Sequence, residues 1–291
     1  MEPSSIFDGT IVHMTWPEVE KAADSAVMLV PVAVIEQHGP HLPLATDIYG
    51  ASLLCRLASE ELQRAGIETV VAPPYYFGMA PSTAMFPCTL SLSREAMVPA
   101  LTEMLLGYAQ WGFKRQFVIN HHGDPSHNEA VAEAITAARG RGAEVVLTLG
   151  GWVGQIIEAV HTSAFGTSLP LAEEAILRAP ESEETRKAWK RLSRSELCVH
   201  AEERETSLIM RWYPALLQDG ISLASLPPVL PNSAELDSAI GEGKWREISP
   251  FGYIGYPSVA TAANGELYAF EARDIARAIA AWLKAQAAEE A

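Results

Sequence analysis

The stretch that decides the fold is VMLVPVAVIEQHGPHLPLATD, residues 27–47. Its first part, Val27 to Ile35, is apolar throughout, as expected of a parallel strand that is buried on both faces. Gly39, Pro40 and Pro43 follow closely and prevent the next segment from simply becoming a helix. The sequence therefore predicts a buried strand that ends in a polar, Gly/Pro-rich turn.

That turn contains a glutamate, two histidines and an aspartate, namely Glu36, His38, His41 and Asp47. Carboxylate and imidazole groups at this density, at the carboxyl end of a buried strand, suit a borderline divalent metal such as zinc or manganese. The alternative interpretation is a polar loop that caps the next helix, with Thr46 or Asp47 as the N-cap residue.

Two later segments carry similar groups. Phe117 to Ile119 is predicted to be a short buried strand, and it leads into NHHGDPSHN, residues 120–128, and then a helix at about 129–139. Because ligands collect at the carboxyl ends of strands in an open α/β sheet, the two turns are expected to share one site. HAEERETS, residues 200–207, opens a further helix but is weaker evidence by itself.

The rest of the chain alternates between strand and helix patterns. Helices are expected at about 17–24, after Thr15 as N-cap, and at about 47–64 and 93–111, with strands at 69–72 and 143–149. Residues 266–288 are expected to form a short strand and then an amphipathic helix. This order predicts an α/β fold: one domain, residues 1–291, with a mainly parallel sheet and helices on both faces. Residues 164–195 differ in character and are predicted to be an inserted helical segment, either a surface hairpin, a lid or an oligomer contact.

Composition narrows the functional class. The chain has 291 residues and a net charge of −15 at pH 7, which argues against nucleic acid and anionic membranes as partners. It shows no apolar run long enough to cross a bilayer and no secretory signal. The three cysteines are widely spaced and odd in number, which indicates reduced thiols and not a disulfide framework. We therefore expect a cytoplasmic enzyme, and the absence of G-x-G-x-x-G and P-loop patterns gives no support to nucleotide binding.

Taken together, the polar segments resemble the motifs of the creatininase family of metal-dependent amidohydrolases. Residues 36–47 match the family pattern E-Q-H-G-P-H-L-P-L-x-T-D throughout. In the second motif, N-G-H-x-x-N, Asn120 and His122 match, but His121 replaces the usual Gly and Pro125 the usual Asn. In the third, H-A-G-E-x-E-T-S, Glu202 replaces the usual Gly. These departures suggest a substrate unlike that of the better-known members.

The resemblance implies a creatininase-like fold and two divalent ions per chain, Zn²⁺ and/or Mn²⁺, with Fe²⁺ as an alternative. Asp47 would bridge the ions, Glu36 and His122 would complete one of them, and His38 would bind the other. The last protein ligand is either Asp124 or Glu205. We favour Asp124, which follows His122 in the same turn and leaves Glu205 a catalytic role, although its side chain is one carbon shorter than glutamate.

The resemblance also assigns a reaction. His200 would carry a proton to the leaving nitrogen, while His41 and His121 would either bind metal or orient a ligand. Trp152 is a candidate for stacking on the substrate. The expected activity is hydrolysis of a cyclic or linear C–N amide bond of a small molecule by a metal-bridged water. Alternatives are a deformylase, lactone hydrolase or isomerase on the same fold, and a non-catalytic metal-binding scaffold. Family members commonly form homo-oligomers, often hexamers.

Overall fold

Parallel strands arranged side by side form the frame of the molecule. The structure is a computed structural model that describes residues 5–151, 154–158, 169–192 and 198–289. Its sheet has the strand order β2-β1-β3-β4-β5, and every neighbouring pair is parallel. The strands are β1 (Val27–Val32), β2 (Thr69–Val71), β3 (Arg115–Asn120), β4 (Glu144–Leu149) and β5 (Ile176–Arg178). Val32 at the end of β1 is in register with Asn120 at the end of β3, so the two polar turns start side by side.

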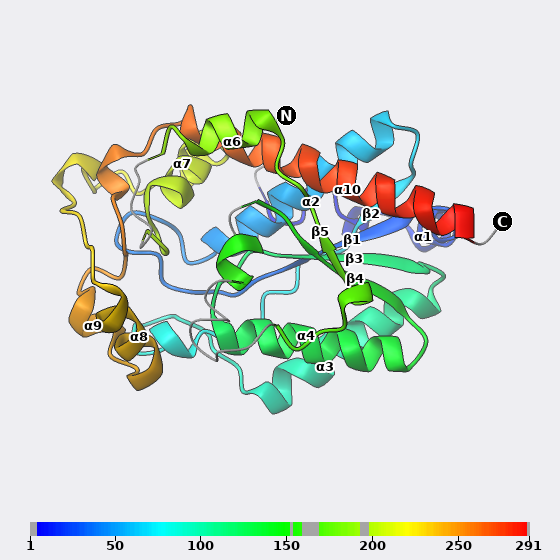
Figure 1. The fold of residues 1–291 in the computed structure, drawn as a ribbon, viewed down its shortest axis with the longest axis horizontal. Helices are drawn as coiled ribbons and strands as arrows, with labels where there is room; N and C mark the ends of the chain where they lie inside the picture. The colour runs from blue at the N-terminus through cyan, green and yellow to red at the C-terminus, as the bar shows by residue number, and fades with distance from the viewer. Residues whose placement is uncertain (1–4, 152–153, 159–168, 193–197, 290–291) are drawn as a thin grey trace.

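Helices cover both faces of this sheet (Figure 1). One face packs against α3 and α4, and the other packs against α2 and α10. Met28 and Val30 of β1 enter the first core, while Val27 and Leu29 enter the second, which explains why the strand is apolar without alternation. The four helices are α2 (Thr46–Arg64), α3 (Arg94–Gln110), α4 (Pro125–Gly140) and α10 (Leu267–Glu289). The predicted single α/β domain with a parallel sheet is confirmed.

The remaining described helices are shorter. They are α1 (Trp16–Ala23), α6 (Glu183–Trp189), α7 (Glu203–Trp212), α8 (Ser233–Glu242) and α9 (Trp245–Ile248). The predicted N-cap of α1 is confirmed, since Thr15 and Glu18 form a capping box there. Among the helices of the described ranges, none is both long and apolar enough to span a membrane.

Two segments differ from the sequence-based expectation. The short strand predicted at the start of 266–288 is wrong, because residues 264–266 form a 3₁₀ turn that leads directly into α10. Leu267, Ala272, Ile275 and Ile279 are buried along that helix, and this helical spacing lets it pack on α2. Within 164–195, the structure shows β5 at the sheet edge as well as α6. Residues 164–168 and 193–195, like Trp152, lie outside the described residues, and the role of this segment remains a prediction.

Candidate metal centre

The turn after β1 folds back on itself. The Glu36 N–H donates a hydrogen bond to the Leu44 carbonyl at 2.9 Å, which closes the loop. Gly39 adopts a φ of 67°, and a Cβ there would lie 3.0 Å from His41 Nδ1, so the bend requires glycine. His38 Nδ1 lies 3.0 Å from the Glu36 carbonyl oxygen. This contact turns the other ring nitrogen of His38, Nε2, toward Asp47.

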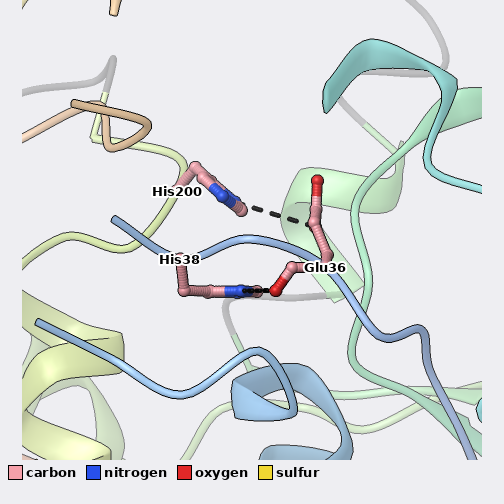
Figure 2. Close-up of side chains that lie close together, drawn as sticks. All are labelled: Glu36, His38 and His200. Atoms are coloured by element: carbon pink, nitrogen blue, oxygen red, sulfur yellow. Dashed lines mark hydrogen bonds and ion pairs between the residues drawn. The ribbon is translucent and has the colours of Figure 1, made fainter. Parts of the chain in front are cut away.

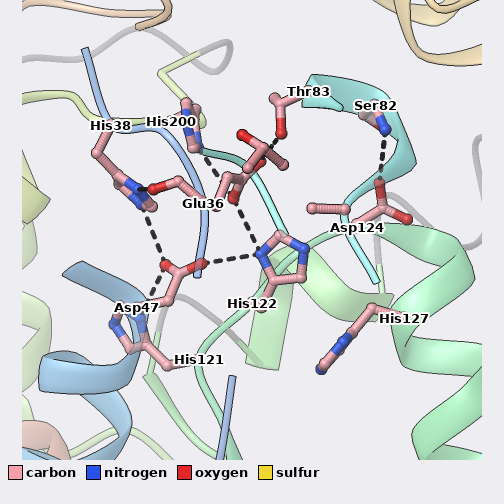
Figure 3. Close-up of polar contacts among 12 residues, drawn as sticks. Glu36, His38, Asp47, Ser82, Thr83, His121, His122, Asp124, His127 and His200 are labelled. Atoms are coloured by element: carbon pink, nitrogen blue, oxygen red, sulfur yellow. Dashed lines mark hydrogen bonds and ion pairs between the residues drawn. The ribbon is translucent and has the colours of Figure 1, made fainter. Parts of the chain in front are cut away.

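Asp47 lies at the centre of the site, in the first turn of α2, and is 2% exposed. Its Oδ1 is 3.3 Å from His38 Nε2, and its Oδ2 is 2.9 Å from His122 Nδ1 (Figure 3). His122 follows β3, and its Nδ1 also lies 3.3 Å from Glu36 Oε2. The two oxygens of one carboxylate therefore face different histidines, which come from different strand ends.

The third segment contributes His200 and Glu205. His200 Nδ1 lies 3.9 Å from Glu36 Oε2 (Figure 2), and the His200 ring lies 4.4 Å from the His38 ring between centroids. The other ring nitrogen, His200 Nε2, is 2.8 Å from the backbone oxygen of Gln37. The Gln37 side-chain amide lies 3.1 Å from the same nitrogen, but the backbone oxygen is closer and can only accept, which favours the tautomer with the proton on Nε2 and with Nδ1 facing the site. Glu205 is in the first turn of α7, with Oε2 3.8 Å from His38 Nε2.

These side chains form three overlapping groups whose ligand atoms lie within 4.8 Å of one another. The groups are Glu36 with His38 and His200, Glu36 with Asp47 and His122, and His38 with Asp47 and Glu205. We call their members together the metal centre. Glu36 Oε2 and His38 Nε2 are buried and have no hydrogen-bond partner among the described residues. Buried polar atoms without a partner are costly, and oxygen and imidazole donors suit zinc or manganese. The residues thus fit divalent cations.

The charges at the metal centre are strongly coupled. Burial alone would lower the pKa of His38, but the carboxylates of Asp47, Glu205 and Glu36 outweigh it and raise this pKa to about 10. His122 shows the same balance, with burial opposed by Glu36 and Asp47, and its pKa is raised to about 9. Burial would raise the pKa of Asp47, yet the surrounding imidazoles hold it well below its usual value. Without metal, imidazolium groups therefore compensate the carboxylates.

Asp124, the metal ligand that the sequence favoured, is in none of the three groups. Its Oδ2 accepts a hydrogen bond from Ser82 Oγ at 2.6 Å, and its Oδ1 accepts one from the Ser126 N–H at 2.9 Å. Asp124 is the N-cap of α4, with Pro125 at the first helical position. An Asp-Pro-Ser sequence is a typical start of a helix, so the sequence itself indicated that Asp124 would cap α4.

A second set of buried charges lies behind Glu205, and sequence reasoning missed it. Arg204, 1% exposed, places Nε 3.3 Å from Glu202 Oε1 and Nη2 3.3 Å from Glu205 Oε1. Glu202 is the N-cap of α7, and burial raises its pKa to about 7 although Arg204 opposes this. We call Glu202, Arg204 and Glu205 the arginine cluster. The replacement of Gly by Glu202 in the third motif was the available signal.

His41 and His127 contact side chains outside the three groups. His41 Nε2 lies 3.0 Å from Thr206 Oγ1, and burial lowers the pKa of His41 to about 4. His127 lies outside the groups, with Nε2 3.2 Å from Asn120 Oδ1. Thr83, also missed from the sequence, donates a short hydrogen bond to Glu36 Oε1. It comes from the loop between β2 and α3, which the family motifs quoted above do not include.

A cavity of about 70 Å³ opens over the metal centre. Its apolar wall is formed by Pro125, Ile156, Val199, Leu236 and Trp245. Leu236 is on α8 and Trp245 on α9, so these two helices form part of the lining. The cavity therefore joins the polar groups around Asp47 to an apolar lining.

Buried carboxylates and imidazoles around a shared aspartate, at the carboxyl edge of a parallel sheet, suit a hydrolase with a metal site. The family model for creatininase, described as creatinine amidohydrolase, matches residues 12–282, and the chain belongs to this family. It is accordingly a creatininase-family hydrolase, as the sequence motifs predicted.

Curated relatives and solved structures agree with this assignment. The mycofactocin precursor peptide peptidase of Mycolicibacterium smegmatis is 29% identical over 242 residues, which cover 82% of this chain and 78% of the relative. The creatinine amidohydrolase of Pseudomonas putida is 27% identical over 125 residues, 40% of this chain and 45% of the relative. A solved structure named Creatininase Mn superposes with a TM-score of 0.65 at 19% identity, covering 93% of this chain and 97% of that chain. This last likeness shows the fold.

Proposed function

We propose that the chain hydrolyses the C–N amide bond of a small, linear, peptide-like molecule at a centre that holds two divalent ions. The observation that carries the proposal is the position of Asp47, whose two oxygens face His38 and His122 separately. A carboxylate shared in this way is suited to bridge two cations. Glu36 and His122 would hold one ion with Asp47, and His38 and Glu205 would hold the other.

Glu205 is proposed here as the last ligand in preference to Asp124. Glu205 groups with His38 and Asp47, whereas both Asp124 oxygens accept hydrogen bonds from Ser82 and Ser126. Burial would raise the pKa of Glu205, but His38 and Arg204 lower it, so the ionised form required of a ligand is available at neutral pH.

The mechanism combines Lewis acidity with a placed proton carrier. When bound, divalent ions lower the pKa of water and polarise a carbonyl oxygen. His200 holds its Nε2 proton against the Gln37 carbonyl, which leaves Nδ1 to take up a proton at the site and deliver it to the leaving nitrogen. Thr83 fixes Glu36 by donating to Oε1, and the apolar wall with Trp245 excludes water from one side of the cavity.

The relatives support a linear amide as the first choice of substrate. Relatives named peptidases match 82% to 92% of this chain, whereas the creatinine amidohydrolase of P. putida matches 40%. Hydrolysis of a small molecule that is not a peptide is the second candidate, because a 3-dehydro-scyllo-inosose hydrolase of Thermotoga maritima is 29% identical over 122 residues, 42% of this chain.

The test is a reconstitution experiment. Chelator-treated protein is loaded with Zn²⁺ or Mn²⁺, its metal content is measured, and it is assayed on matched dipeptides, cyclic amides, formamides and lactones. We expect about two ions per chain and metal-dependent cleavage of dipeptide amides. Cleavage only of lactones or formamides would replace the amide assignment, and metal binding with no turnover on any of them would favour a scaffold.

A further inference from the structure

His121 lies beside the metal centre but belongs to none of its three groups. It stands where the second family motif usually has glycine, and its side chain is 1% exposed. Nδ1 of His121 lies 3.6 Å from Asp47 Oδ1, beyond hydrogen-bond distance, and it is a buried atom with no hydrogen-bond partner among the described residues. In Figure 3 the rings of His38, His121 and His122 approach the Asp47 carboxylate from three different directions.

Tyr268 of α10 holds the other side of this ring. Its hydroxyl lies 3.2 Å from His121 Nε2, and the two rings are 5.6 Å apart. Burial raises the pKa of Tyr268 well above its ordinary value, so the hydroxyl keeps its proton. One tautomer satisfies both neighbours: Tyr268 donates to Nε2, and Nδ1–H points at the ionised Asp47, which can only accept.

Helix α2 makes room for the ring. Gly50 lies one turn after Asp47 in α2, and a Cβ there would meet the His121 ring at 2.6 to 2.7 Å. Glycine within a helix is less favourable than alanine. His121 replaces the usual glycine of the motif, and Gly50 in the facing helix leaves the space that the His121 ring occupies.

We propose that His121, held by Tyr268, is a positioning residue that fixes the orientation of the Asp47 carboxylate toward the ions it is proposed to bridge. The inference rests on the proposed metal centre but not on any substrate. A carboxylate that bridges two ions must keep both oxygens in place, and His121 restrains Oδ1 from a direction that neither His38 nor His122 occupies.

The experiment is a Co²⁺ titration of the chelator-treated full chain, followed by visible absorption and melting temperature. His121→Gly should keep the wild-type number of ions but bind them about 10–100-fold more weakly, as when other outer partners of a ligand are removed. Its Co²⁺ spectrum should change as well. Tyr268→Phe, which preserves volume, should shift both readouts in the same direction. His121→Asn retains an amide donor near the Nδ1 position and should recover much of the affinity.

Two controls make the result specific. Tyr75→Phe removes another buried hydroxyl, which donates to the Met97 carbonyl in the opposite core, and should leave affinity and spectrum unchanged. Gly50→Ala should weaken binding by displacing the ring, yet add little to His121→Gly in the double variant.

Three outcomes would overturn the inference. A lower melting temperature with wild-type affinity and spectrum would reduce His121 to packing. Loss of one ion in His121→Gly would make it a ligand. A wild-type protein that binds no Co²⁺ would remove the metal centre itself, which distinguishes failure of the proposed function from failure of this inference.

Discussion

The metal centre and the arginine cluster are adjacent, buried and rich in carboxylates, but they balance charge differently. In the metal centre, Glu36 and Asp47 face imidazoles, and His38 Nε2 has no hydrogen-bond partner among the described residues. In the arginine cluster, Arg204 lies 3.3 Å from both Glu202 and Glu205. Arginine is a permanent cation, whereas imidazole can exchange its proton for a metal ion. The cations of the metal centre are therefore imidazolium groups that a metal ion could replace, whereas the cation of the arginine cluster is fixed.

Glu205 belongs to both clusters. Its Oε2 faces His38 and its Oε1 faces Arg204. Arg204 can hold the Glu205 carboxylate in place while metal ions bind to, or leave, the proposed sites beside His38. This division of roles can be broken or sharpened by experiments that act on one cluster at a time.

The largest effect is expected from Asp47→Asn. An amide cannot replace a bridging carboxylate, so both ions should be lost together, and metal-dependent hydrolysis with them. Elemental analysis of protein loaded with Zn²⁺ provides the measurement. Retention of one ion would mean that Asp47 is a ligand of a single metal and not a bridge.

Glu205→Ala and Asp124→Ala form the next comparison. Glu205→Ala should remove one of the two ions. Asp124→Ala should keep both and lower the free energy of unfolding by about 0.5–2 kcal/mol, the usual effect of deleting an N-cap. Metal content and urea unfolding separate the two. The reverse pattern would return the ligand role to Asp124.

His200→Ala tests whether the imidazole at the edge of the metal centre is a proton carrier or a ligand. Both ions should remain bound, while turnover should fall about 10²–10⁴-fold. A substrate with a better leaving group should recover part of this loss because it needs less protonation. If His200→Ala instead lost an ion, the group of Glu36, His38 and His200 would be a metal site.

Arg204→Met probes the fixed side of the comparison. Removing the buried cation leaves Glu202 without its cationic partner and leaves Glu205 with His38 alone, so the metal-free protein should lose about 3–5 kcal/mol of stability in urea unfolding. The matched control is Arg94→Met, which removes an exposed arginine paired with Glu129 and Glu133 and should change stability by about 0–1 kcal/mol. Equal effects for the two variants would argue against a structural role for the arginine cluster.

The smallest expected effect is the release of protons when metal ions bind. Because the pKa values of His38 and His122 are raised from 6.5 to about 10 and about 9, both rings are protonated at pH 7 without metal. Loading should release about two protons, and affinity should fall as the pH falls. These raised values stabilise the metal-free fold below pH 6.5, and that contribution is lost as the pH rises through about 9 and 10. Calorimetry in buffers of different ionisation enthalpy measures the number of protons released. No release at pH 7 would show that both imidazoles are already neutral in the metal-free protein.

Sequence reasoning succeeded where a local pattern and the global fold agree. The apolar run that became β1 needs only burial on both faces, and the motif from Glu36 to Asp47 spans one closed turn and the start of α2. It failed where distant packing decides. Ile176–Arg178 is a short segment among charged residues, and only its pairing with β4 makes it a strand. Leu267 and Tyr268 suit a strand equally well until α2 supplies a helical partner. Arg204 shows no local pattern that predicts a buried ion cluster, and Glu202 in place of the motif glycine marked the position without indicating its partner.

The hydrogen bond from Glu36 N–H to the Leu44 carbonyl has a consequence in coordination chemistry. It closes residues 36–44 into a small ring that contains Glu36 and His38, with Asp47 three residues beyond it at the start of α2, and closing a small loop loses little chain entropy. His200 and Glu205 must instead be brought from far along the chain. His122 likewise reaches the metal centre only through the pairing of β1 with β3, and each group of possible ligands includes a residue from outside this stretch. We therefore expect a partly unfolded chain to keep the geometry of this ring before it can complete either proposed ion site.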